Sequence, residues 1–353
     1  MRILALTRYD RLAASSRLRM HQFKAHLEAQ GIFLRPQPFF DDDYVRAMYG
    51  ADRSAKSIAG YFIRRAMGLL RCTDADAIWL EKEAFPWLPW IIEAAFLPRS
   101  IPLIVDYDDA IFHQYDMHDS AAIRTLLGHK IDAVMRRADL VIAGNSYLAE
   151  RAQSAGAARV EIIPTVVDLE RYTSTGPKTG TGPIVIGWIG SPKTAPYLAP
   201  TKRLISDLAR RQCISCVAIG ARKDQVAESP FVAKEWSEAA EIDLLRGLDV
   251  GIMPLPDDPW TRGKCGYQLI QYMACGLPVV ASPVGANRHI VQHGDNGFLA
   301  STDQEWELAL TRLISSRDVR HRLGAAGRER VEREFSLQAQ APRLEQLLRS
   351  VSA

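Results

Sequence analysis

Short runs of apolar residues alternate with longer amphipathic stretches along the whole chain. In the first half, the apolar runs predict strands at Ile3–Thr7, Ala77–Leu80, Leu103–Val105, Leu140–Ala143 and Val160–Ile163. The stretches between them predict helices such as Ser16–Gln30, which Gly31 would end, and Ile123–Arg137. Strands that alternate with helices indicate parallel sheets covered by helices on both faces. The predicted fold class is therefore α/β.

The second half repeats this order of elements. Its predicted strands are Ile184–Trp188, Cys216–Ile219, Val250–Met253 and Val279–Ala281. Its predicted helices are Thr201–Arg211, Ala239–Gly247, Tyr267–Cys275 and Gln304–Ser315.

The two halves are separated by TSTGPKTGTGP at residues 173–183, which has almost no apolar residue and predicts a linker. We therefore expect one domain over 1–172 and a second over 184–335. A helical pattern at Leu337–Val351 predicts a terminal helix within 336–353, and the sequence leaves open which domain it packs on.

Length and charge narrow the function classes. The chain has 353 residues, 47% of them hydrophobic, which suits two globular domains of ~100–200 residues each. Its net charge is only +3, and basic residues are interleaved with acidic ones. A nucleic-acid-binding protein usually carries a clustered basic excess, so nucleic acid is not an expected partner.

Cysteine usage bears on the compartment and on metal binding. The five cysteines are odd in number, and the opening MRILALT lacks the features of a signal peptide, which favours a reducing, cytoplasmic setting. Cys213 and Cys216 form a C-x-x-C pair, but a zinc site needs about four ligands and no second pair is present. We expect buried structural thiols at this pair and no metal.

No stretch reaches the ~20 apolar residues of a membrane-spanning helix. The nearest is AFPWLPWIIEAAFL at 84–97, which is rich in aromatic residues and follows a basic segment at 64–71. Two interpretations remain open for this region: peripheral contact with the inner face of the cytoplasmic membrane, and a packed helix pair.

The segment from Trp260 to Ala300 carries the most specific chemistry. A glycine-containing loop over Thr261–Gly266 enters a predicted helix at Tyr267. The N–H groups at a helix N-terminus favour a bound anion such as a diphosphate, and Lys264 adds a full positive charge. The sequence therefore predicts a phosphate-binding loop here.

This segment resembles the donor-binding signature of retaining glycosyltransferase family 4, in a form similar to that of bacterial surface-polysaccharide enzymes. The family pattern is Glu, seven residues, then Glu-Ala-Met-Ala-x-Gly-x-Pro-Val-Val-Ala. The matching residues are Gly266, Met273, Ala274, Gly276, Pro278, Val279, Val280 and Ala281. Gly263 and Gln271 replace the two glutamates, although Gln271 can still hydrogen-bond a ribose hydroxyl.

The resemblance implies the GT-B fold, with two Rossmann-like domains whose parallel sheets face across a cleft. It implies transfer of a sugar, with retention, from a UDP- or GDP-linked donor to a saccharide or lipid-linked acceptor, with no cofactor and no metal. The implied donor-binding residues are Gly190, Ser191, Lys193, Leu255, Gly263, Gly266, Tyr267 and Gln271.

The first domain supplies the other candidates. The loop after the first strand, RYDRLAASSR, places Ser15, Ser16 and Arg17 where the family's glycine-rich loop approaches phosphates and the acceptor. The stretch DYDDAIFH follows another strand, and three acids at a strand's carboxyl end favour a site over simple helix capping. We expect Asp106 near the acceptor or a phosphate. Asp108 and Asp109, together with Lys264, are the expected catalytic residues.

Two other functions compete with glycosyl transfer. An epimerase or phosphorylase on the same scaffold would turn over nucleotide sugar without an acceptor, or would depend on phosphate. The two replaced glutamates also suit a non-catalytic partner in a polysaccharide assembly complex. Donor binding without turnover would favour that second alternative.

Overall fold

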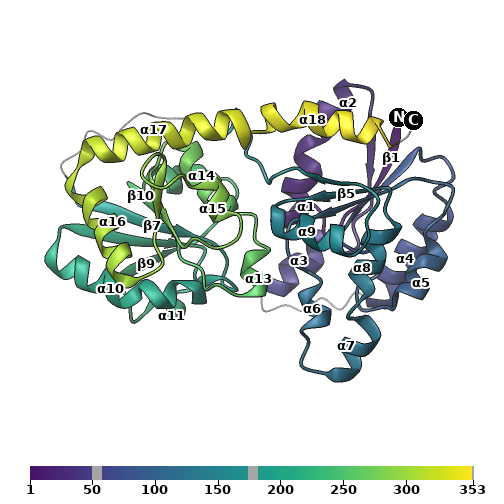
Figure 1. Cartoon of the computed structure of the whole chain (residues 1–353), viewed down its shortest axis with the longest axis horizontal. Helices are drawn as coiled ribbons and strands as arrows, with labels where there is room; N and C mark the ends of the chain where they lie inside the picture. The colour runs from purple at the N-terminus through teal and green to yellow at the C-terminus, as the bar shows by residue number, and fades with distance from the viewer. Residues whose placement is uncertain (50–57, 174–181, 352–353) are drawn as a thin grey trace. The chain divides into compact units, whose positions relative to one another are not determined.

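The computed structural model describes residues 1–49, 58–173 and 182–351, and these divide into two compact units (Figure 1). The first unit comprises Met1–Thr165, Gly263–Cys265 and Gln340–Ala353. The second comprises Val166–Arg262 and Gly266–Ala339. The expected linker at 173–183 falls largely on 174–181, which lie outside the described residues. The domain limits at 172, 184 and 335 stay predictions.

The first unit is built on a six-stranded parallel sheet in the order β2-β1-β3-β4-β5-β6. The strands are β1 (Arg2–Leu6), β2 (Phe33–Pro36), β3 (Ala77–Glu81), β4 (Leu103–Tyr107), β5 (Leu140–Ala143) and β6 (Val160–Ile162). The helices are α1 (Ala14–Arg19), η1 (His21–Phe23), α2 (Lys24–Ala29), α3 (Asp42–Tyr49), α4 (Ile58–Leu70), α5 (Trp90–Phe96), α6 (His113–Asp116), α7 (Ala121–Leu127), α8 (Lys130–Arg137) and α9 (Ser146–Ser154).

The second unit has a six-stranded parallel sheet in the order β12-β11-β10-β7-β8-β9. The strands are β7 (Ile184–Ile189), β8 (Ile214–Ile219), β9 (Phe231–Lys234), β10 (Val250–Met253), β11 (Val279–Ala281) and β12 (Gly297–Leu299). The helices are η2 (Ala195–Leu198), α10 (Ala199–Arg211), α11 (Lys223–Val226), α12 (Glu241–Arg246), α13 (Pro259–Arg262), α14 (Tyr267–Ala274), α15 (Asn287–Ile290), α16 (Asp303–Ser315) and α17 (Arg317–Glu334). The predicted α/β class with two parallel sheets is confirmed.

The last helix, α18 (Leu337–Arg349), is grouped with the first unit from Gln340 onward. Its side chains bond there: Arg349 Nη2 donates to the main-chain oxygen of Gln30 at 2.5 Å. Next to it, Ser350 Oγ accepts from Arg159 Nη1 at 2.7 Å. The sequence left open which domain this helix packs on, and these contacts show that its C-terminal part packs on the first unit.

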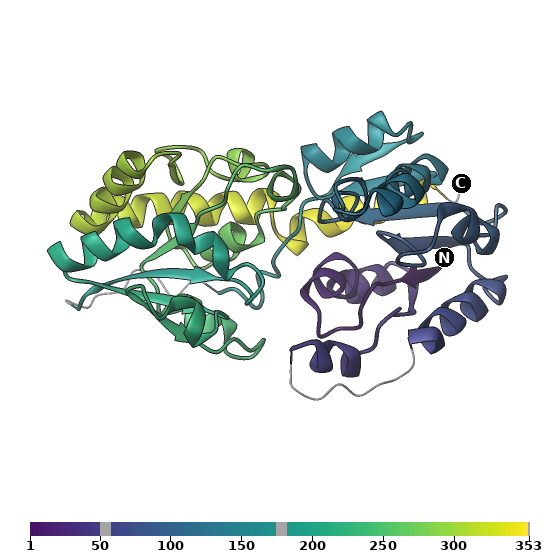
Figure 2. The ribbon, with the colours of Figure 1, turned by 90° about the horizontal axis from the view of Figure 1, so that it is seen from below.

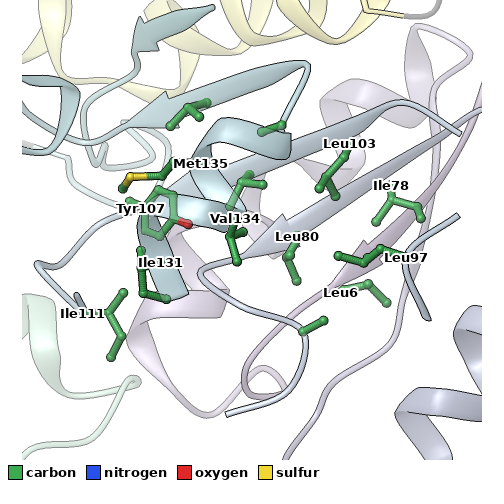
Figure 3. Packing of buried hydrophobic residues seen from close by; sticks show 14 of the residues in the cluster. Leu6, Ile78, Leu80, Leu97, Leu103, Tyr107, Ile111, Ile131, Val134 and Met135 are labelled. Atoms are coloured by element: carbon green, nitrogen blue, oxygen red, sulfur yellow. The ribbon is translucent and has the colours of Figure 1, made fainter. Parts of the chain in front are cut away.

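An apolar cluster in the first unit packs residues of its sheet against α8, and it extends to α4 and α9 (Figure 3). Leu80 and Leu103 from the strands, with Val134 and Met135 from α8, are at most 1% exposed. Strands with helices on both faces are apolar at every position, which explains why β3 and β4 are recognisable as unbroken apolar runs.

The second unit's sheet separates two apolar clusters, with helices on both sides of it (Figure 2). Along β11, Val279 and Ala281 belong to the cluster that includes α14, whereas Val280 belongs to the one that includes α10 and α16. Successive side chains of a strand point to opposite faces, so a strand buried on both faces must be continuously apolar.

Two of the predicted helices are wrong in extent. The expected Ser16–Gln30 helix is divided into α1, η1 and α2, with the break at Met20, where φ is −128°. The expected Ile123–Arg137 helix is divided into α7 and α8. Gly31 does end α2 as predicted: its φ is +76°, and Ile32 N–H donates to Leu27 O at 2.8 Å, as in a Schellman motif.

Three strands escaped sequence prediction, namely β2, β9 and β12. Each is an edge strand of its sheet. Phe33 and Val232 in two of these strands are more than half exposed, as an edge position allows. The fourth edge strand, β6, was nevertheless predicted, so an edge position alone does not explain the omissions. The thiol prediction is also wrong in part, because Cys216 is buried but Cys213 is exposed.

Candidate active site

Open α/β sheets bind ligands at the carboxyl ends of their strands, where the strand order reverses. In the first unit this point lies between β1 and β3, and in the second between β7 and β10. The loops that follow these strands are therefore the candidate site in each unit.

Glu81, the last residue of β3, anchors the loop after β1. It is 1% exposed, and its two carboxylate oxygens accept from Ser15 Oγ at 2.5 Å and Ser16 Oγ at 2.6 Å. It also accepts from the main-chain N–H of Arg8 at 2.8 Å. Both predicted serines thus use their hydroxyl protons within the protein, and a ligand would meet them only as acceptors. Their contact with substrate stays a prediction.

Asp106 is paired with a buried arginine that the sequence did not single out. Arg19 donates to its two carboxylate oxygens at 2.7 and 3.1 Å, and to Ile163 O at 2.8 Å. Burial raises the pKa of Asp106 to about 6, against the lowering by Arg19. The predicted Arg17 is also buried, and its Nη1 lies 3.3 Å from Leu12 O. The side chains of Asp106 and Arg17 therefore bond to other protein groups, and their contact with a substrate stays a prediction.

Asp108 forms an ion pair with Lys82, the residue that follows β3. Lys82 Nζ lies 2.8 Å from Asp108 Oδ1, and these side chains are 7% and 15% exposed. Burial alone would raise the pKa of Asp108, but the charge and hydrogen bond of Lys82, the charge of Arg19 and a hydrogen bond from Ser15 together lower that pKa below its usual value of 3.8. Asp109, which is more exposed, lies 3.9 Å from Lys264 Nζ. The three expected catalytic residues thus lie in the same unit.

The loop Gly263–Cys265 is fixed by Asn145, the N-cap of α9. The Asn145 side-chain amide donates to Gly263 O and to Lys264 O, each at 3.0 Å. Cys265 Sγ donates to Asp108 O at 3.1 Å. This arrangement joins the main chain beside Lys264 to the main chain of Asp108.

Gly263 stands where the family signature has its first glutamate, and the space around it explains the glycine. A Cβ at this position would lie 2.4 Å from Ala110 Cβ and 2.8 Å from Ala110 N. No side chain fits there without displacing the main chain of the acidic loop.

In the second unit, Gly266 is the N-cap of α14, and its φ of +65° favours glycine. Gln271 on this helix is 2% exposed, and its Nε2 donates to Tyr172 OH at 2.8 Å. Tyr172 OH in turn donates to Glu241 Oε1 at 2.5 Å and lies 3.4 Å from Tyr267 OH. Gln271 is therefore tied into a network that includes a buried acid.

The remaining predicted donor contacts follow β7 and β10. Gly190 and Ser191 enter a turn in which Ser191 N–H donates to Thr194 Oγ1 at 3.0 Å. Lys193 is exposed at this turn. Leu255 N–H donates to Ser282 Oγ at 3.0 Å. The N–H groups of Ser191 and Leu255 are thus bonded within the protein, and the contact of these four residues with a donor stays a prediction.

The structure groups the predicted residues by unit. Ser15, Ser16, Arg17, Asp106, Asp108, Asp109, Gly263 and Lys264 belong to the first unit, and Gly190, Ser191, Lys193, Leu255, Gly266, Tyr267 and Gln271 to the second. Sequence reasoning missed Lys82, Arg19, Tyr172 and Glu241. Lys82 had a local signal, since it lies between two acids after an apolar strand. Tyr172 had none, because it meets Gln271 across 99 residues.

Two searches of the described residues bear on metals and membranes. Residues 1–49, 58–173 and 182–351 contain no group of three or more His, Cys, Asp or Glu side chains placed to hold a metal ion. Within the same ranges, no helix is sufficiently long and apolar to cross a membrane.

Part of this chain is similar in sequence to known proteins. Residues 207–316 match the family described as Glycosyl transferases group 1. This part of the chain resembles group 1 glycosyltransferases. A D-inositol 3-phosphate glycosyltransferase from Thermobispora bispora is 29% identical over 165 residues. That match covers 46% of this chain and 33% of the relative, so the chain spans about a third of the length of that protein.

Solved structures match over nearly the whole chain. Anabaena HepE in complex with UDP-glucose has a TM-score of 0.71 at 17% identity, covering 99% of this chain and 100% of that one. Sucrose-phosphate synthase from Thermosynechococcus elongatus has a TM-score of 0.73 at 15% identity, covering 99% of each chain. The expected GT-B fold of glycosyltransferases is confirmed.

Proposed function

We propose that this chain transfers a sugar from a nucleoside-diphosphate sugar to a hydroxyl of a saccharide or lipid-linked acceptor, with retention, in surface polysaccharide or glycoconjugate synthesis. One observation carries the proposal. Asp108, Asp109 and Lys264 lie in one unit at the carboxyl edge of its sheet, and Lys264 belongs to residues 207–316, which resemble group 1 glycosyltransferases.

The reaction breaks a sugar–phosphate bond, and negative charge develops on the leaving diphosphate. Lys264 and the N-terminus of α14 at Gly266–Tyr267 stabilise that charge. The leaving phosphate helps to take the proton of the acceptor hydroxyl. Asp108, which its low pKa keeps ionised, accepts a hydrogen bond from a sugar hydroxyl and orients it. No metal ion is needed, so EDTA should leave the transfer rate unchanged.

The donor is UDP- or GDP-linked. The shared fold with Anabaena HepE, which was crystallised with UDP-glucose, supports the UDP form. A thermal-shift panel of UDP, GDP and their sugars tests the proposal. At 100 times its Kd, the true nucleotide stabilises the chain by ~2.7 kcal/mol, which raises Tm by several degrees.

Lys264→Ala sharpens this test. A hydrogen bond to a charged group is worth ~1.5–3 kcal/mol, so the variant should bind the nucleotide about 10- to 100-fold more weakly. Lys223→Ala is the matched control, since it removes the same charge from an exposed position on α11. Equal affinity of the two variants would remove Lys264 from the donor site.

A non-catalytic role is the second candidate, and Gly263 and Gln271 favour it because they stand in for the two acids of the signature. Nucleotide binding with no transfer to any acceptor would support this role. Donor turnover without an acceptor, or in dependence on phosphate, would instead indicate the epimerase or phosphorylase chemistry.

The proposed site of action is an anionic membrane surface. Apolar side chains are exposed on α4 and α5, which lie side by side in the first unit (Figure 1): Ile63 is 57%, Leu70 66% and Ile91 78% exposed. Arg71 and Arg99 are exposed beside them, and the one acid within 58–73 and 84–102, Glu93, is fully buried. An apolar patch with exposed arginines beside it suits anionic lipid head groups, although the exposed Asp74 and Asp76 follow Arg71 in the sequence.

A further inference from the structure

The segment Lys82–Trp87, between β3 and α5, has an unusual backbone. Lys82 has φ +66° and Trp87 has φ +65°, and among the described residues these are the two non-glycine residues with positive φ. An L side chain is disfavoured in this left-handed region, and such residues gather where a structure serves a function. Glycine or asparagine would adopt this conformation more easily, so the lysine side chain itself must have a role here.

A buried ionic network holds the segment in this conformation. Glu83 is fully buried and receives Lys130 Nζ at 2.6 Å, Arg8 Nη1 at 2.9 Å and Tyr115 OH at 2.9 Å. Lys130 also pairs with Glu93 at 3.0 Å, and Glu93 accepts from Ala84 N–H at 2.7 Å. The segment is thus bonded through its side chains and its main chain directly after Lys82.

What this backbone presents is the ammonium group of Lys82. Its Nζ lies 2.8 Å from Asp108 Oδ1, donates to Ser15 Oγ at 3.0 Å and lies 3.9 Å from Glu81 Oε1. Its main-chain N–H donates to Asp106 O at 3.0 Å. One side chain therefore joins the loops that follow β1, β3 and β4.

We propose that Lys82 is a positioning residue for glycosyl transfer, which holds the Asp108 carboxylate in the orientation that meets a sugar hydroxyl. This inference rests on the proposed function. The strained backbone is retained because a shorter or neutral side chain cannot bridge Ser15 and Asp108 from the end of β3.

The charges around Asp108 show why it needs a cation. Glu81 and Asp106 are buried acids of the neighbouring strands, and Asp109 follows Asp108 directly. Arg19 also lowers the pKa of Asp108, but its guanidinium is bonded to both oxygens of Asp106. Among residues 1–49, 58–173 and 182–351, Lys82 is thus the cation that forms an ion pair with the Asp108 side chain.

A double-mutant cycle on the full chain tests the inference. With UDP-glucose or the donor found in the nucleotide panel, Lys82→Met should lower kcat by about 10- to 100-fold, the range for partners that orient an active group. The KM of the donor should stay within about twofold, because the residues proposed to hold the diphosphate are unchanged. Lys82→Arg should recover part of the rate, and the acid limb of the kcat–pH profile of Lys82→Met should move to higher pH.

The decisive comparison is made in the Asp108→Asn background. If Lys82 acts through Asp108, adding Lys82→Met there should change kcat by less than about threefold. If the fold-losses in kcat of the two single variants multiplied in the double variant, the inference would be overturned. A wild-type kcat for Lys82→Met would overturn it as well. Lys24→Met, at an exposed ion pair on α2, is the control that should retain the wild-type rate. Absence of transfer by the wild type would overturn the proposed function together with this inference.

Discussion

The two units share one architecture and differ in the charge at the carboxyl edges of their sheets. In the first unit, Glu81, Lys82 and Asp108 are ionisable side chains with little exposure at the ends of β3 and β4. In the second, Ser191 and Leu255 directly after β7 and β10 are neutral, and the charged side chains further along these loops, Lys193 and Asp257, are exposed. Topology decides where a ligand site forms, whereas side chains decide what chemistry it supports.

The buried networks behind these edges differ in the same way. In the first unit, one cation, Lys130, serves two acids, Glu83 and Glu93. In the second, the acid Glu241 is met by neutral donors, Tyr172 OH and Trp236 Nε1. An ionic network is more damaging to break than a neutral one, because it leaves unpaired charge in the interior.

Breaking the ionic network should give the largest effect on stability. Lys130→Met leaves Glu83 and Glu93, both fully buried, without their shared cation. We expect the free energy of unfolding to fall by ~3–5 kcal/mol. Urea denaturation at pH 7 measures it, and two separate transitions would locate the loss in one unit.

The same substitution at the surface supplies the control. Lys24 pairs with Glu28 one turn away on α2, and these side chains are 40% and 33% exposed. Lys24→Met should therefore change stability by less than ~0.5 kcal/mol. Equal losses at the two positions would contradict a special role for the buried network.

The strands show how far sequence patterns reach. β5, β10 and β11 occur with the predicted limits, because strands covered on both faces must be apolar throughout. β2, β9 and β12 were missed and all three are edge strands, although the fourth edge strand, β6, was predicted. Periodicity also could not reveal the break at Met20, which follows directly after Arg19, the last residue of α1 and the partner of Asp106.

The site was predictable where its residues are neighbours in sequence. The acids of the DYDD stretch and Lys264 follow from strand ends and from the glycine-containing loop. The partners that fix them come from distant segments: Asn145 reaches Lys264 O, and Tyr172 reaches Gln271. No local pattern encodes such contacts, because they depend on how the strands are ordered in each sheet.

Restoring the family's second glutamate should damage the second unit. The single proton of Tyr172 OH is donated to Glu241, so the contact with Gln271 requires a donor at 271. Gln271→Glu offers only acceptors and adds a second acid to a buried site. We expect a loss of ~2 kcal/mol in unfolding free energy at pH 7, measured by urea denaturation.

Gln292→Glu, at an exposed position of the same unit, is the control for this change. It should alter stability by less than ~0.5 kcal/mol. A Gln271→Glu variant as stable as the wild type would mean that Tyr172 can reorient, and would weaken the explanation of the glutamine.

The exposed patch is a third contrast between the units. Removing Leu70 and Ile91 together by substitution with serine should lower binding to vesicles rich in anionic lipid by about tenfold, since each side chain loses apolar area. Vesicle co-sedimentation at low and physiological salt measures the change. Leu308→Ser, at a 71% exposed position on α16, should leave binding unaltered. If Leu308→Ser lost binding, or if the double variant bound as well as the wild type, the patch would be excluded as the membrane-binding surface.

The smallest expected effect concerns how the free energy of unfolding changes with pH. Asp106 and Asp108 in the first unit should contribute to that change in opposite directions. The folded pKa of Asp108 is depressed, so its contribution, ~1 kcal/mol, is present above pH 3.8 and disappears as pH falls through the lower folded value. The pKa of Asp106 is raised from 3.8 to about 6, chiefly by burial, so its contribution instead declines as pH rises across that window.

Urea midpoints of wild type, Asp108→Asn and Asp106→Asn between pH 3 and 7 separate the two cases. The gap between wild type and Asp108→Asn should be constant from pH 7 to about 4.5 and then close, because both forms are neutral at 108 in acid. For Asp106→Asn, the unfolding free energy of the wild type relative to the variant should decrease from pH 4 to 6. If the stability difference from wild type changed with pH in the same way for both variants, Lys82 and Arg19 would shift the pKa of their acids in the same direction. The electrostatic reason for pairing Lys82 with Asp108 would then be removed.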